Sequence, residues 1–206
     1  MNFPNTLSVL RIILSPVFLF LFLSGNDTLV VLSFFVFTLA ALTDWYDGWY
    51  ARKYGFKTQW GQFLDPLADK ILTSCALLSF LFYKNLNPSF LGNDSFISFG
   101  VLIGIIIARD IFLTLMRSYK ELRGQSFKTS MISKTKTFIQ MTYIFFVIGF
   151  MAAGITFKNT LLYQATINYL DSDINYYLML IITALTVGSA IAYFFETSTD
   201  SPKGTP

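Results

Sequence analysis

Six long apolar stretches constrain what this chain can fold into more than any other feature. They cover residues 7–24, 28–50, 66–83, 96–118, 136–157 and 176–195. A helix needs about 20 apolar residues to cross a bilayer, and lipid offers no partner to free backbone N–H and C=O groups. Helices are therefore the architecture open to these stretches. The sequence predicts an all-α integral membrane protein, built as one bundle of six transmembrane helices over residues 1–196.

The ends of the chain and its composition complete this prediction. Hydrophobic residues make up 54% of the chain and charged residues only 13%, which is typical of a membrane protein. The third stretch is the weakest, because Asp69 and Lys70 interrupt its start. Residues 1–5 carry no basic side chain and Arg11 breaks the first stretch, so no cleavable signal peptide is predicted. Residues 197–206 are polar and contain Pro and Gly, and we expect a disordered tail there.

Lysine and arginine gather in the connections on one side of the predicted bundle. The basic side has seven such residues in its connections: Arg52, Lys53, Lys57, Lys120, Arg123, Lys128 and Lys134. The opposite side has two, Lys84 and Lys158. Positive side chains favour the cytoplasmic side of a membrane. We therefore predict a multi-pass protein of the cytoplasmic (inner) membrane, with both termini and the site described next in the cytoplasm.

Four aspartates at or beside the apolar stretches are candidate site residues: Asp44, Asp47, Asp65 and Asp69. A carboxylate at membrane depth is costly, so it indicates function by default. Residues three, four and seven apart share a helix face. Two faces then combine acids with small residues, Asp44-Asp47-Gly48-Ala51 and Gly61-Asp65-Ala68-Asp69. Facing each other, they would form a pocket where a ligand approaches the backbone closely, with Pro66 starting or kinking the second helix.

Clustered carboxylates repel one another unless cations neutralise them. Ligands that offer only oxygen suit Mg2+ or Mn2+. The chain has no histidine and one cysteine, which argues against an ordinary zinc or iron site. The alternative is structural: some of these acids cap helices or pair with Arg52 and Lys70.

A basic group follows at the same predicted membrane face. Arg109 lies about two turns before Arg117 in the fourth stretch, and Lys134 and Lys136 open the fifth. Arginine and lysine both bind phosphate well, so this group suits a phosphate on a second substrate. Two alternatives stay open. Arg109 can pair with its neighbour Asp110, and ordinary charges near anionic lipid can account for Lys120, Arg123, Lys128, Lys134 and Lys136.

Residues 44–69 read D-x2-D-G-x2-A-R-x8-G-x3-D-x3-D. This pattern resembles the signature of the CDP-alcohol phosphatidyltransferases, integral membrane enzymes of phospholipid synthesis. The resemblance implies that Asp44, Asp47 and Asp65 bind one or more divalent metal ions. It implies that Asp69 is the general base for the acceptor hydroxyl and also contacts metal. The residues it implies for binding the CDP group are Asn5, Asp44, Gly48, Ala51, Arg52, Thr58 and Gly61.

Softer similarities extend over most of the chain, to bacterial members of this family that use glycerol phosphate. They include Asn2–Ser8 with Arg11, similar to an N-terminal interfacial segment, and the Arg109-Asp110 pair. This resemblance implies phosphatidyl transfer from CDP-diacylglycerol to sn-glycerol 3-phosphate, with release of CMP. It also implies a homodimer in the lipid bilayer with no nucleic-acid partner. The residues it implies for the acceptor phosphate are Arg109, Arg117, Lys134 and Lys136.

Other functions remain to be separated from this one. The nearest is the same reaction with another acceptor: phosphatidylglycerol, as in a cardiolipin synthase, or serine or inositol phosphate. An intramembrane prenyltransferase also binds a diphosphate through Mg2+, but the short gap from Asp47 to Asp65 and the six spans argue against it. A cation transporter would place its acids near the bilayer midplane, whereas these acids lie toward one face beside basic residues.

Overall fold

Seven α-helices make up the secondary structure of the computed structural model, which describes residues 3–54, 59–82, 93–122, 131–158, 160–170 and 173–199. The helices are α1 (Phe3–Leu23), α2 (Asp27–Tyr54), α3 (Gln59–Phe82), α4 (Asn93–Leu122), α5 (Met131–Thr156), α6 (Leu161–Leu170) and α7 (Asp173–Thr199). The prediction of an all-α protein is confirmed.

The helix boundaries extend the predicted stretches and add one element. Six helices correspond to the six apolar stretches: α2, α4 and α7 extend beyond their stretches at both ends, whereas α1, α3 and α5 begin earlier and end one residue before their stretches do. The short helix α6 was not predicted. Helix α1 already begins at Phe3, so the described part of the expected interfacial segment forms its first turns. Helix α7 runs on to Thr199, three residues into the expected tail, and residues 200–206 lie outside the described part of the chain.

Four helices of the described chain are long and apolar enough to cross a membrane. Their candidate spans are Asn5–Leu23, Asp27–Tyr50, Thr135–Thr156 and Ile174–Ala192. Helices α3 and α4 are long as well, but charged residues interrupt them: Asp65, Asp69 and Lys70 in α3, and Arg109, Asp110 and Arg117 in α4. The apolar helices indicate a membrane protein, whereas the predicted count of six spans is not confirmed.

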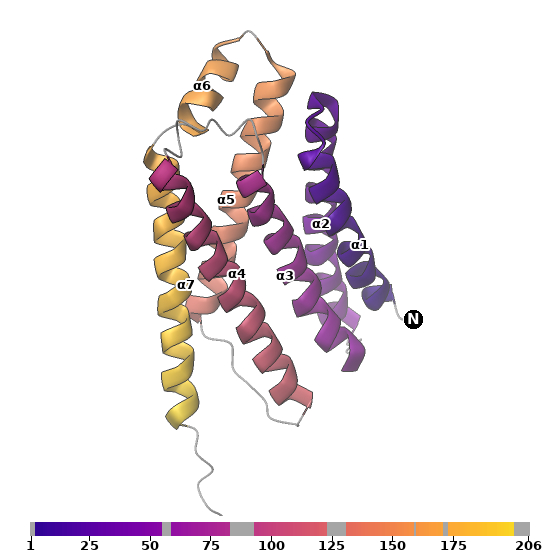
Figure 1. The fold of residues 1–206 in the computed structure, drawn as a ribbon. Coiled ribbons are helices and arrows are strands. Elements are labelled where there is room, and N and C mark those ends of the chain that lie inside the picture. The colour runs from indigo at the N-terminus through magenta and orange to yellow at the C-terminus, as the bar shows by residue number, and fades with distance from the viewer. Residues whose placement is uncertain are drawn as a thin grey trace, which may run out of the picture.

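The long helices run side by side and alternate in direction (Figure 1). Helix α1 packs against α2 and α3, α4 packs against α7 and α3, and α5 packs against α2. The alternation brings the N-terminal ends of α1, α3 and α5 to the same end of the bundle as the C-terminal ends of α2, α4 and α7 (Figure 1). Helix α6 lies at the opposite end. The acidic motif and the basic group therefore belong to one end of the bundle, as the sequence predicted.

A continuous apolar core joins the helices behind that end. Phe18 of α1 lies between Phe22 of the same helix and Phe37 of α2, with ring centroids 5.6 and 5.5 Å away. Farther along, the ring of Phe80 in α3 meets Tyr143 of α5 edge-on at 6.4 Å. Lipid tails are as apolar as these side chains, so close van der Waals packing holds such helices together. The core thereby fixes the ends of α1, α2, α3 and α5, where the polar residues lie.

Candidate active site

Helices α2 and α3 carry the four aspartates at the positions that the spacing predicted. Asp44 and Asp47 lie one turn apart on α2, and Asp65 and Asp69 lie one turn apart on α3. Proline has no backbone N–H and often starts a helix. Helix α3 nevertheless begins at Gln59 and contains Pro66, so Pro66 does not start it. The extra turns ahead of Pro66 set Asp65 inside the helix, on a regular backbone.

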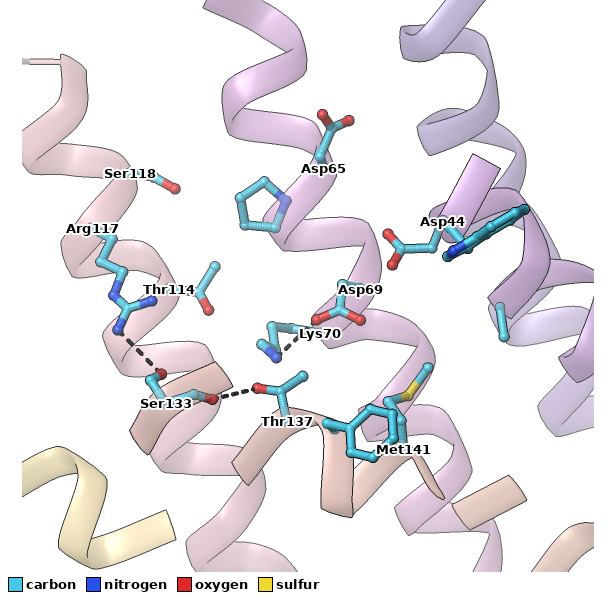
Figure 2. Close-up of a pocket in the computed structure, with 14 residues that line it drawn as sticks. Asp44, Asp65, Asp69, Lys70, Thr114, Arg117, Ser118, Ser133, Thr137 and Met141 are labelled. Carbon is cyan, nitrogen blue, oxygen red and sulfur yellow. Dashed lines mark hydrogen bonds and ion pairs between the residues drawn. The ribbon is translucent and has the colours of Figure 1, made fainter. Parts of the chain in front are cut away.

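A cavity of about 950 Å3 lies between α2, α3, α4 and α5. Figure 2 shows Asp44 of α2 and Asp65 and Asp69 of α3 toward one side, and Arg117 of α4 toward the other, directed at Ser133. The remaining lining is Ala41, Trp45, Pro66, Lys70, Thr114, Ser118, Ser133, Thr137, Phe138 and Met141. Pockets of this size bind small molecules and cofactors. The structure thus brings three of the four predicted acids and one predicted phosphate-binding arginine to a single cavity.

Arg11 of α1 joins the two acids of α2. Its side chain is fully buried; one Nη group donates to Asp44 and the other donates to Asp47 at 2.6 Å. The sequence pattern predicts Arg11 only as a break in the first apolar stretch and as part of a similar N-terminal segment. The signal that could have found it is the rule applied to the acids: a charge inside an apolar helix implies a partner.

The two acids of α3 have partners of their own. The buried hydroxyl group of Ser8 donates to Asp65, and Lys70 forms an ion pair with Asp69 at 2.8 Å. The alternative that an acid pairs with Lys70 is therefore confirmed for Asp69. Asp65 precedes the apolar part of α3; burial raises the pKa of its carboxyl group, and the hydrogen bond from Ser8 opposes that rise.

These four carboxylates match a divalent cation in chemistry, since they offer oxygen alone. Their positions are a different matter: among the described residues, no three acidic, histidine or cysteine side chains converge where one metal ion could be held. Arg11, Ser8 and Lys70 each bond carboxylates of this set.

The predicted phosphate-binding residues separate into two groups. Arg117 lines the cavity and donates to the hydroxyl group of Ser133 at 3.3 Å. Lys136 instead donates to both oxygens of Asp110 at 2.6 Å, well inside the bundle. Arg109 bonds Asp110 at 3.0 Å and Ser189 of α7 at 2.6 Å, which is the local pairing named as an alternative. Neither Arg109 nor Lys136 is among the cavity-lining residues.

The residues predicted to bind the CDP group are only partly described. Asp44 lines the cavity, and Asn5 and Gly48 are half-buried on α1 and α2. Ala51, Arg52 and Gly61 lie within helices, but only their backbone is described. Thr58 lies outside the described residues. The side chain of Lys134, predicted for the acceptor phosphate, is likewise not described.

Comparison with known proteins gives a family and several relatives. The model of the family described as CDP-alcohol phosphatidyltransferase matches residues 1–188. A Rickettsia typhi protein named CDP-diacylglycerol–glycerol-3-phosphate 3-phosphatidyltransferase is 32% identical over 157 residues, 76% of this chain and 82% of its own. Proteins of the same name from Wigglesworthia glossinidia brevipalpis and Bacillus subtilis are 35% and 33% identical; they cover 74% and 68% of this chain, and 85% and 72% of their own.

Proposed function

Because the chain belongs to the CDP-alcohol phosphatidyltransferase family, we propose that it transfers the phosphatidyl group of CDP-diacylglycerol to sn-glycerol 3-phosphate. The products are phosphatidylglycerol phosphate and CMP. The names of the relatives support this acceptor. The family match also removes the prenyltransferase and the transporter as explanations of the acidic motif.

One observation carries the proposal: a single cavity has acids on one wall and Arg117 on the other. A CDP group and an acceptor phosphate both bring negative charge to this space. The acidic wall suits the diphosphate when a divalent cation lies between them, and the guanidinium group suits the phosphate directly. The two anionic substrates would thus bind side by side without relying on the same protein groups.

The reaction needs one bond to form and one to break. The hydroxyl oxygen of the acceptor bonds to the phosphatidyl phosphorus, and the bond from that phosphorus to the oxygen of CMP breaks. Asp69 takes the hydroxyl proton, and CMP leaves with the bonding electron pair. Asp69 lines the cavity, and Lys70 bonds one of its oxygens.

Mg2+ or Mn2+ is the cofactor of this proposal. Bound by Asp44, Asp47, Asp65 and Asp69, it would neutralise the diphosphate and thereby help CMP to leave. The chemistry of the donors supports this role, since four carboxylates come from two neighbouring helices. The side chains predicted for the CDP group would orient it over these acids, with Gly48 and Ala51 leaving room for cytidine.

The proposed setting is the cytoplasmic side of the inner membrane. Lys53 and Lys120 lie in the last turns of α2 and α4, at the end of the bundle that holds the cavity, and positive residues favour the cytoplasm. Glycerol 3-phosphate would enter from water, and the lipid donor would enter from the bilayer. A homodimer, expected from the family, completes the proposal; its test is the mass of the purified protein in detergent.

The test is CMP release by the purified protein with CDP-diacylglycerol and Mg2+, with and without glycerol 3-phosphate. We expect release that depends on glycerol 3-phosphate. A second acceptor is included because Arg109 and Lys136 bond Asp110 rather than line the cavity. Release with serine, inositol phosphate or phosphatidylglycerol, and none with glycerol 3-phosphate, would retain the family reaction and reject our acceptor.

A further inference from the structure

Helix α1 presents two buried polar side chains to the acidic motif. Ser8 and Arg11 lie three residues apart, on one face of the helix, and both are fully buried. Ser8 reaches Asp65 of α3, and Arg11 reaches Asp44 and Asp47 of α2. Together they contact three of the four acids, which come from two different helices.

The geometry of a guanidinium group sets how Arg11 holds its two partners. The group is planar, and its two Nη atoms are fixed relative to each other. One bonds Oδ1 of Asp44 and the other bonds Oδ2 of Asp47. The two carboxylates are therefore held close together in defined orientations, although their charges alone would drive them apart.

The contacts leave the Asp44 carboxylate able to bind a ligand in the cavity. Each bond from Arg11 uses one oxygen, and a carboxylate can contact a guanidinium group through one oxygen and a metal ion through the other. The side chain of Asp44 is 44% exposed and lines the cavity. Arg11 itself is fully buried and is not among the cavity-lining residues, so it acts on substrates only through the acids.

We propose that Arg11 is a positioning residue for the divalent cation, assisted by Ser8. This inference rests on the proposed function, because it assigns to α1 the task of gathering the acids that bind the cation. Side chains behind metal ligands typically affect metal affinity by about 10–100-fold when they are changed. The nearest competing explanation is that Arg11 stands in place of the cation and competes with it.

The test measures Mn2+ binding by the purified protein in detergent, from the loss of the free Mn2+ signal in electron paramagnetic resonance. Arg11→Lys keeps the charge but loses the two-pronged contact, and we expect Mn2+ to bind about 10–100-fold more weakly. Ser8→Ala removes one contact to Asp65 and should give a smaller loss, of a few-fold. The matched control is Ser15→Ala. Ser15 is equally buried on α1, but within the described part of the chain its hydroxyl group donates to the backbone carbonyl of Arg11 at 2.7 Å and to no acid, and its loss should leave Mn2+ binding unchanged.

A second readout separates positioning from a structural role. The Mg2+ concentration for half-maximal CMP release should rise in Arg11→Lys, while the KM for glycerol 3-phosphate stays close to that of the unchanged protein. Size-exclusion profiles and melting temperatures identify variants that fold. If Arg11→Lys does not fold, Ser8→Ala takes its place in the same test.

Three results would overturn the inference, and they are distinguishable. Tighter Mn2+ binding in Arg11→Lys would make Arg11 a competitor of the cation. Equal Mn2+ binding in the folded variants would make Arg11 and Ser8 structural only, with the proposed function intact. Equal binding by the unchanged protein and Asp65→Asn would remove the metal site itself, and the inference with it.

Discussion

Two ion clusters at the same end of the bundle have opposite arrangements of charge. In one, a single cation, Arg11, bonds two carboxylates, Asp44 and Asp47. In the other, a single carboxylate, Asp110, bonds two cations, Arg109 and Lys136. Each cluster therefore carries an excess of one sign, and the two excesses are opposite.

The clusters differ in how they meet the cavity. The Asp44 side chain is 44% exposed and borders the cavity, whereas the side chains of Asp110 and Lys136 are 3% and 1% exposed and lie behind it. Burying an ion pair is tolerated only when the partners satisfy each other closely. We call the Asp110 cluster closed, because its charged groups are buried and bond one another, joining α4 to α5 and α7. We call the acidic cluster open, because Asp44 borders the cavity and can take up a ligand.

The largest expected effect is the loss of the general base. Asp69→Asn keeps the shape of the side chain but cannot accept the proton, so CMP release should fall by about 100–10,000-fold. The melting temperature should fall less than in the Asp110→Asn variant described next, because the side chains of Lys70 and Asp69 are 15% and 19% exposed and water can solvate Lys70. Near-normal activity in this variant would remove Asp69 from its role.

Breaking the closed cluster should cost mainly stability. Asp110→Asn leaves Arg109 and Lys136 buried without their counter-charge, and removing one partner of a buried ion pair costs about 3–5 kcal/mol. We expect a clear drop in melting temperature in detergent. Ser189→Ala is the matched control, since it removes one hydrogen bond to Arg109 and leaves the charges as they are. An Asp110→Asn variant as stable as the unchanged protein would show that the cluster is not closed in the sense described.

Arg117 should affect the acceptor and little else. Arg117→Met removes a guanidinium group from the cavity wall, and hydrogen bonds to charged groups contribute about 1.5–3 kcal/mol. The KM for glycerol 3-phosphate should therefore rise about 10–100-fold, with a smaller change in the KM for CDP-diacylglycerol. Lys53→Met is the control, because it also removes a positive charge but comes from a side chain exposed over Trp49. An equal rise in both variants would indicate a general charge effect rather than binding by Arg117.

The smallest expected effect on stability comes from the open cluster. Asp44→Asn removes an excess carboxylate but leaves the contact of Arg11 with Asp47, so the melting temperature should stay the same or rise. Activity should still be lost, because a predicted metal ligand is gone. A fall in melting temperature as large as that of Asp110→Asn would erase the difference between the two clusters.

The acidic motif could be predicted because each pair of aspartates is spaced to share one face of its own helix. Asp44, Asp65 and Asp69 needed only their own helices and the alternation of helix direction to meet. The sequence could not predict which cation holds which acid. Arg11 lies 33 residues from Asp44 along the chain, and that contact depends on how α1 packs against α2.

For the basic residues, too, the sequence could not predict which charges pair. The spacing along α4 predicted a phosphate site at Arg109, and Lys136 of α5 was expected to join it. In the structure both side chains bond Asp110 instead. A buried charge pairs with the nearest counter-charge. Helix α6 was missed for a different reason: its ten residues are too few for a membrane-crossing pattern.

The most direct test of the account is a stoichiometry measurement with CDP-diacylglycerol, Mg2+ and radiolabelled glycerol 3-phosphate. We predict that the label enters the lipid fraction in step with CMP, one molecule of each per turnover, and that Asp69→Asn stops both together. Absence of both products from folded, unchanged protein, or CMP release without labelled lipid, would contradict the assignment of this cavity to phosphatidyl transfer.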